Sequence, residues 1–280
     1  MLLLLCTFFS CEKPSFDSDV ESQMVGNLTV SVNQIERTPF SSFTRATVPV
    51  AEVCTRLNYA IYDMGGTRVK QVNQVAGDAN FGTTGFQLEE GTYQLVVVGH
   101  SSSGNPTMTD PTAIKFTNAN GFTDTFLYNE NITIGEEPID KQITLNRIVA
   151  LCRVVITDDF PSEVKKMRFY YTGGSGAFDA ATGLGSVNSK QDVKVDVDGS
   201  QKQFDLYTFL HDTEGTIHLT VTALDANGSE LYHREFDVPM EQNYISWLTG
   251  AFFAEGGSSS SASISITANT DWAGDKHFTF

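Results

Sequence analysis

The sequence is poor in basic residues, cysteine and tryptophan, and it has few long apolar runs. Its 280 residues include 18 Lys and Arg against 34 Asp and Glu, which gives a formal net charge of -16. A phosphate backbone selects for a basic surface, so this balance argues against a nucleic-acid partner. It suits a soluble, repulsive exterior that faces the medium. No segment after the N-terminus is apolar for long enough to cross a membrane, and the length suffices for two domains with real cores.

The N-terminal apolar run, residues 1–10, has about half the length that a membrane-spanning helix needs. It has the size of the apolar centre of a secretion signal, and Ser10 stands directly before Cys11. This arrangement resembles a bacterial lipobox, whose cysteine becomes the acylated first residue of the mature protein. We therefore predict a signal peptide over 1–10, lipid attachment at Cys11 and a flexible tether over 11–24. The alternative is a buried N-terminal strand that carries a thiol.

Short strands separated by turns dominate the rest of the chain. LTVSV, from Leu28 to Val32, alternates apolar and polar residues at the period of a half-buried strand. GTYQLVVVGH, from Gly91, is apolar on both faces, which is typical of a strand at the centre of a sheet. Asn227-Gly228 predicts the turn of a hairpin between two alternating runs. Residues 101–119 are rich in Ser, Thr, Asn, Pro and Gly and predict a loop, and the glycine-rich TGGSGAFDAATGLG, from Thr172, predicts a connection between strands. Because no amphipathic helix of three or more turns is present, the pattern predicts an all-β protein built from β-sandwiches.

A change of pattern near Asp140 predicts a division into two sandwiches, over residues 25–140 and 141–280. Within the second, 254–280 reads as a Gly/Ser-rich linker and a tail strand. A clean strand on such a linker either completes its own sheet or adds to the sheet of another subunit. The candidate donor strand is Ser263, Ile264, Ser265, Ile266, Thr267 and Ala268.

Residues that carry chemistry are sparse. The histidines show no metal-ligand spacing, no serine stands on a G-x-S-x-G elbow, and the DVDG segment lacks the further ligands of a calcium loop. We therefore expect no enzymatic activity, no metal and no small-molecule cofactor. Cys54 and Cys152 fall in different predicted domains, which favours two separate thiols, although an oxidising compartment would permit a disulfide between them.

The order of features resembles the Bacteroidales fimbrial anchor and fimbrillin superfamily, especially its FimB-like anchor branch. The resemblance spans most of Cys11 to Phe253 and is strongest at LNRIVA, Leu145 to Ala150, and at VPMEQNYISWLTG, Val238 to Gly250. It implies two tandem transthyretin-like (Greek-key) β-sandwich domains on the outer face of the outer membrane. In that family, major subunits lose an N-terminal strand after cleavage behind an arginine, and a neighbour's C-terminal strand fills the groove. Anchor members keep their lipid.

The resemblance leads us to expect an outer-membrane lipoprotein that acts as a fimbrial anchor or assembly subunit, with other fimbrial subunits as partners. Arg37 and Arg45 lie in a Ser/Thr-rich segment that a protease could reach, and they are the candidate cleavage sites. The alternative is a surface module that binds glycans or proteins. A glycan module would need an exposed aromatic platform, for which Trp247 and Trp272 are the only tryptophans. Trp247 lies in an apolar run and is expected to be buried.

Overall fold

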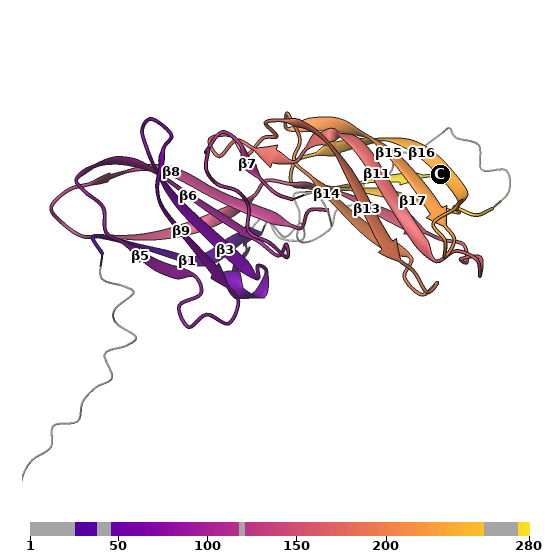
Figure 1. Cartoon of the computed structure of the whole chain (residues 1–280), viewed down its shortest axis with the longest axis horizontal. Coiled ribbons are helices and arrows are strands. Elements are labelled where there is room, and N and C mark those ends of the chain that lie inside the picture. The colour runs from indigo at the N-terminus through magenta and orange to yellow at the C-terminus, as the bar shows by residue number, and fades with distance from the viewer. Residues whose placement is uncertain (1–25, 38–45, 118–120, 255–273) are drawn as a thin grey trace, which may run out of the picture.

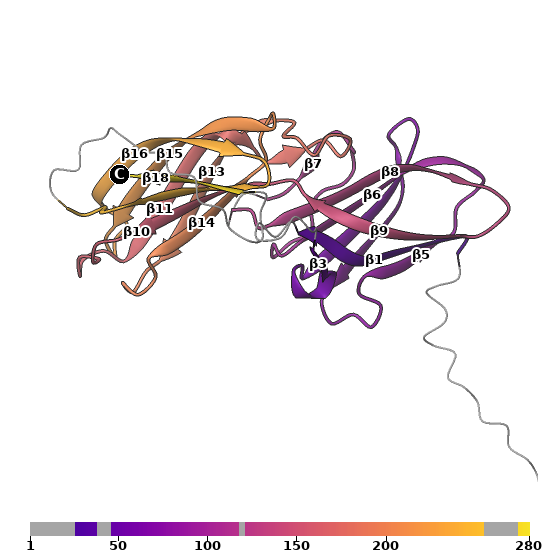
Figure 2. The same cartoon turned by 180° about the vertical axis from the view of Figure 1, so that it is seen from behind.

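The computed structural model describes residues 26–37, 46–117, 121–254 and 274–280, and its two lobes lie end to end (Figures 1 and 2). We call residues 26–147 the N-terminal lobe and residues 148–280 the C-terminal lobe. The described chain is all-β, as predicted: its single helical segment, η2 (Val50–Glu52), is one turn of 3-10 helix. Among the described residues, no helix has the length and apolar character required to span a membrane.

The N-terminal lobe is a sheet that folds over into two layers around one core. The strand order is β2-β1-β9-β8-β6-β3-β4, with β5 beside β1. The corner lies between β8 and β9, which share only the pairs Phe126↔Arg147 and Leu127↔Asn146. The strands are β1 (Leu28–Arg37), β2 (Ala46–Pro49), β3 (Arg56–Asp63), β4 (Arg68–Val75), β5 (Thr83–Phe86), β6 (Gly91–His100), β8 (Thr125–Ile134) and β9 (Ile139–Arg147).

The predicted central strand is confirmed as β6, which lies between β8 and β3. Leu95 and Val97 point into the core between the two layers. Val96 and Val98 point to the opposite face, where they join a second apolar cluster that also contains residues of the C-terminal lobe. A strand covered on both faces needs apolar residues at every position, which explains the unbroken apolar run.

The C-terminal lobe is a sandwich of two four-stranded sheets. One sheet has the order β14-β10-β17-β18 and the other has the order β13-β11-β15-β16. Cys152, Phe169 and Leu219 lie in the core between them. The strands are β10 (Ala150–Ile156), β11 (Lys166–Ser175), β13 (Asn188–Asp196), β14 (Gln203–Thr208), β15 (Glu214–Leu224), β16 (Glu230–Glu241), β17 (Tyr244–Gly250) and β18 (Gly274–Thr279).

Three details differ from the sequence prediction. The division predicted between residues 140 and 141 falls inside β9, which pairs with β1 from Ile139 to Leu145, so 141–147 belong to the N-terminal sheet. The glycine-rich segment predicted as a connection begins as the end of β11. The segment predicted as a loop over 101–119 contains the short strand β7 (Ile114–Lys115), which pairs with β12 (Ala177–Phe178) of the other lobe.

The two terminal strands run in the same sense along the molecule. β9 ends at Arg147, which contacts Asn243 at the junction of the lobes, so the parallel strand β1 begins at the far pole of the N-terminal lobe. β17 starts beside that junction, and β18 is parallel to it. The described chain therefore begins and ends near opposite poles of the molecule, as Figure 1 shows for the C-terminus.

Candidate functional site: the two terminal strands

β1 is built into the core of the N-terminal lobe. Leu28, Val30, Val32 and Ile35 are at most 1% exposed. Burial of one such side chain contributes about 1.5–3 kcal/mol, so removal of β1 would expose a long apolar groove between β9 on one side and β2 and β5 on the other. The strand is also fixed at its start, since Asn27 donates to the Leu88 carbonyl (2.8 Å) and accepts from its N–H (3.0 Å).

Of the predicted lipidation and cleavage residues, the structure describes only Arg37. Arg37 is the last residue of β1, and its backbone pairs with Ala46, so it belongs to a strand rather than to the open loop that was expected. Arg45, Cys11 and the predicted donor strand 263–268 lie outside the described residues. The roles proposed for these positions stay predictions.

The tail strand that the structure describes is β18, whose first residue lies eleven positions beyond the first residue of the predicted strand. It pairs in parallel with β17 through six registered pairs, from Tyr244↔Gly274 to Thr249↔Thr279. It lies at the edge of its own sheet. The signal for it in the sequence is the alternation of Lys276, Phe278 and Phe280 with His277 and Thr279. This run is short, and the alternation in the earlier segment SISITA is more regular.

The inward side of β18 contacts the opposite sheet of the sandwich. Phe278 is 3% exposed within the core. The Phe280 ring lies 4.8 Å from the ring of Phe236 in β16, measured between centroids. Lys276 Nζ lies 2.8 Å from a carboxylate oxygen of Glu241, at the end of the same strand. β18 thus closes the side of the sandwich on which β17 and β16 face each other.

Gly250 makes room for the end of this strand. A Cβ atom at position 250 would lie 2.2 Å from the Phe280 carbonyl oxygen and 2.8 Å from two atoms of its ring. The Phe280 N–H donates to the Thr249 carbonyl at 3.0 Å, so the two segments are held together at this contact. Any side chain at position 250 would therefore displace the tail.

The outward side of β18 completes a row of four side chains, which we call the ring row. It consists of Asp205, Arg153, Trp247 and His277, and these residues are direct register partners across β14, β10, β17 and β18. Arg153 donates to both carboxylate oxygens of Asp205 at 2.7 Å, and this interaction raises the pKa of the guanidinium. The guanidinium carbon lies 4.9 Å from the Trp247 ring centroid. The Trp247 and His277 rings stack with centroids 5.1 Å apart and an angle of 12° between their planes.

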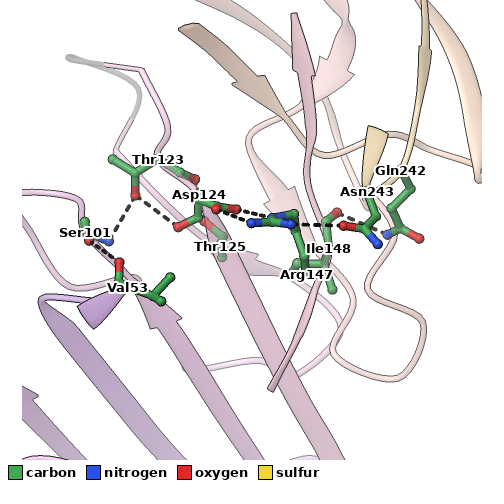
Figure 3. Close-up of polar contacts among 9 residues, drawn as sticks. All are labelled: Val53, Ser101, Thr123, Asp124, Thr125, Arg147, Ile148, Gln242 and Asn243. Atoms are coloured by element: carbon green, nitrogen blue, oxygen red, sulfur yellow. Dashed lines mark hydrogen bonds and ion pairs between the residues drawn. The ribbon is translucent and has the colours of Figure 1, made fainter. Parts of the chain in front are cut away.

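A buried junction joins the two lobes. Figure 3 shows Arg147, whose side chain is 3% exposed, between Asp124 and Asn243. It donates twice to the Asp124 carboxylate at 2.7 Å and once to the Asn243 side-chain oxygen at 3.2 Å. Gln242 donates to the Ile148 carbonyl at 3.1 Å. Asn243 and Gln242 directly precede β17, so the strand that holds the tail begins at this junction.

An apolar cluster surrounds the polar contacts of the junction. Phe209 of the C-terminal lobe packs against Phe116 and Phe122 of the N-terminal lobe, with ring centroids 6.0 and 5.3 Å apart. This junction was not predicted, because the segment around Phe116 has the composition of a loop. The cluster also includes Val98 of the central strand β6, so the second face of the N-terminal sheet is covered by the junction.

Comparison with known families identifies the chain. A family model matches residues 20–279. The chain belongs to the DUF6562 family. This family is described as one of unknown function. No curated protein matches the sequence.

Several solved structures resemble this DUF6562 protein. A candidate adhesin from Bacteroides ovatus is 13% identical, with 83% of this chain and 88% of that chain covered and a TM-score of 0.47. A fimbrial assembly protein from Parabacteroides distasonis is 12% identical, with 86% and 94% covered and a TM-score of 0.42. The fimbrial anchor protein Mfa2 from Porphyromonas gingivalis is 14% identical, with 74% and 81% covered and a TM-score of 0.41.

The cysteines and tryptophans of the DUF6562 protein were the remaining candidate groups. Cys54 and Cys152 are buried thiols in the cores of different lobes, as the sequence favoured, and burial raises the pKa of Cys152 to about 12. Among the described residues, no group of three or more His, Cys, Asp and Glu is placed to hold a metal. Trp247 is half-buried rather than buried, because it stands on the outer face of its sheet. Within the ring row, the Arg153 guanidinium and the His277 ring pack against the Trp247 indole. Trp272 lies outside the described residues.

Proposed function

We propose that this DUF6562 protein is a fimbria-associated surface protein that joins neighbouring subunits by exchange of a terminal β-strand. In the proposal, β18 is the donated strand, the edge of β17 receives it, and a lipid on Cys11 holds the chain at the outer membrane. The observation that carries the proposal is the position of β18, a C-terminal strand at a sheet edge that docks in parallel after a long connection.

The covalent reach of the connection supports exchange. β18 starts opposite Tyr244, the first residue of β17, so the end of β17 and the start of β18 are separated by about the length of that seven-residue strand, about 23 Å. Residues 255–273 form most of the connection between them. A chain of that length can span roughly 60–70 Å. The connection is therefore long enough for the tail to reach the same edge of an adjacent copy.

Exchange would conserve the contacts of the docked strand. An identical strand from a neighbour makes the same register with β17 and places the same phenylalanines in the core. The choice between a chain's own strand and a neighbour's strand then depends on effective concentration. Isolated chains favour their own strand, whereas chains held side by side on a membrane or in a fibre favour exchange.

The N-terminal strand supports a role as an anchor that keeps its first strand. β1 contributes four buried apolar side chains and pairs with three strands, so cleavage behind Arg37 or Arg45 would remove part of a formed core. Two or more acyl chains on Cys11 would hold the protein firmly, at about 0.8 kcal/mol per buried CH₂. The mass and N-terminal residue of the mature protein test this part. An acylated Cys11 supports the anchor, and a chain that begins at Thr38 or Ala46 contradicts it.

Cross-linking between two variants that each carry one added cysteine tests the exchange. Thr249 and Thr279 are register partners across β17 and β18, so Thr249→Cys and Thr279→Cys place two thiols within disulfide range. Each variant is mixed with the other at high concentration and oxidised. We expect a covalent heterodimer, and its absence at all concentrations contradicts exchange.

A matched control uses a strand pair that cannot exchange. Thr92 and Thr133 are register partners in the interior strands β6 and β8. Thr92→Cys and Thr133→Cys should form a disulfide when both lie in one chain, and no heterodimer when the two single variants are mixed. A heterodimer in this control would show that the thiols react through random collision.

A further inference from the structure

The ring row determines which side chains are favoured in a strand that docks on the edge of β17. Neighbouring strands lie about 4.8 Å apart, which is close to the spacing at which flat groups stack. The Asp205 carboxylate holds the Arg153 guanidinium through two parallel hydrogen bonds, and that guanidinium covers one side of the Trp247 indole. The indole is thereby fixed before the tail arrives, so little rotamer entropy is lost when the next side chain stacks on it.

The side chain that arrives is His277, and its ring is nearly parallel to the indole. A flat side chain at this position extends the row, whereas an aliphatic or small side chain leaves the indole face without a stacking partner. The outward position opposite Trp247 therefore distinguishes among strands that offer the same backbone hydrogen bonds.

Contacts on the inward side of the same edge favour particular residues in the docked strand as well. Phe278 fills the core, Phe280 packs on Phe236, and Gly250 lies directly beneath the end of the strand. Glu241 adds an opposite charge for Lys276. Inward positions therefore require a cation followed by two aromatic residues at alternate positions.

We infer that the edge of β17 is a selective receptor for strands of the pattern Lys-ring-Phe-x-Phe, and that the partner it takes is residues 276–280 of a second copy of this chain. The identification of that partner rests on the strand exchange proposed above. The selectivity itself follows from the ring row and from the inward contacts, and it applies equally to a chain's own tail.

Peptide binding to the full chain tests the selectivity. Phe278→Asp in the full chain places a charge in the core, so β18 should leave the edge of β17 and make that edge available to a peptide. A fluorescein-labelled peptide with the sequence of residues 274–280, GDKHFTF, is then titrated and followed by anisotropy. We expect saturable binding, retained affinity when histidine is replaced by phenylalanine, and roughly 2- to 10-fold weaker binding when it is replaced by alanine, from the usual strength of a ring pair. Equal affinity for the histidine and alanine peptides overturns the inference.

Arg153 is a positioning residue in this scheme, and its role has its own readout. Arg153→Lys keeps a positive charge beside Asp205 but removes the flat group that covers Trp247. We expect the ratio of the affinities of the histidine and alanine peptides to fall toward one, with the melting temperature nearly unchanged. A preserved ratio shows that the row is only structural and contradicts the inference.

Two further measurements keep the test decisive. If Phe278→Asp does not fold, hydrogen exchange of the β17 amides is compared between the unaltered chain and His277→Ala, where faster exchange is expected and unchanged exchange contradicts the selectivity. If the peptides are discriminated but no Thr249–Thr279 heterodimer forms, the edge of β17 is selective but binds only the tail of its own chain. That result contradicts the proposed exchange and the second copy as the partner. Heterodimers without peptide discrimination support exchange and overturn the selectivity.

Discussion

Gly250 offers the sharpest test of how the tail docks. In Gly250→Ala, the new Cβ would lie 2.2 Å from the Phe280 carbonyl oxygen, a distance that real Cβ atoms do not show, so the end of β18 must move. That movement draws Phe278 from the core and separates His277 from Trp247. Loss of a buried phenylalanine costs up to about 3 kcal/mol, and loss of a ring pair costs about 0.5–1.5 kcal/mol. We expect a destabilisation of about 2–4 kcal/mol, limited by the free energy of docking the strand.

Hydrogen exchange and denaturant unfolding measure this effect. The amides of β17 that pair with β18 should exchange faster, whereas the core strand β15 should keep its protection because its sheet is separate. Gly215→Ala is the matched control, since its Cβ would meet Leu210 at an ordinary 3.5 Å while the unfolded chain loses the same freedom. If Gly250→Ala is as stable as Gly215→Ala and the β17 amides exchange as before, the docked position of β18 is wrong.

Three further predictions follow from buried groups. Arg147→Ala leaves Asp124 without its bidentate partner at the junction. It should lower the free energy of unfolding by about 3 kcal/mol, measured by urea unfolding. A loss smaller than that caused by removing an exposed ion pair would contradict the role of the junction. Burial lowers the pKa of His100 from 6.5 to about 4. Between these two pH values, His100 is protonated in the unfolded chain but neutral in the folded chain. Stability should therefore fall by about 3 kcal/mol as the pH decreases to about 4, and His100→Gln should lack this part of the slope while carboxylate effects remain. Cys152 should not react with a thiol reagent at pH 8 until the chain unfolds, and reaction of the native protein would show that its core opens.

The strand pattern of this protein was predictable where local chemistry decides it. The hairpin between β15 and β16 follows from Asn227-Gly228: Gly228 adopts a φ of +84°, and the Asp225 carboxylate accepts from the Asn227 N–H. The central position of β6 follows from apolar residues on both faces. In each case the signal lies within a dozen residues and requires no knowledge of the partner strand.

Contacts between distant segments were not predictable in this way. The run ITLNRIVALCRVVI contains no glycine or proline, so nothing in it marks the point near Arg147 where the chain leaves one lobe for the other. The parallel pairing of β1 with β9 joins residues more than a hundred positions apart. The ring row was invisible for the same reason, since Asp205, Arg153 and Trp247 belong to separate stretches that meet only in the folded sheet.

The parallel pairing of β1 with β9 has a mechanical consequence. Leu28 lies at the pole away from the C-terminal lobe, so a pull on the N-terminal end of β1 against the rest of the molecule acts along the strand. All seven registered pairs with β9 then resist sliding together, whereas a pull at right angles would open them one after another. In the proposed anchor, which is held by its N-terminus, drag from the medium would therefore load β1 in shear, the direction in which this strand is hardest to extract.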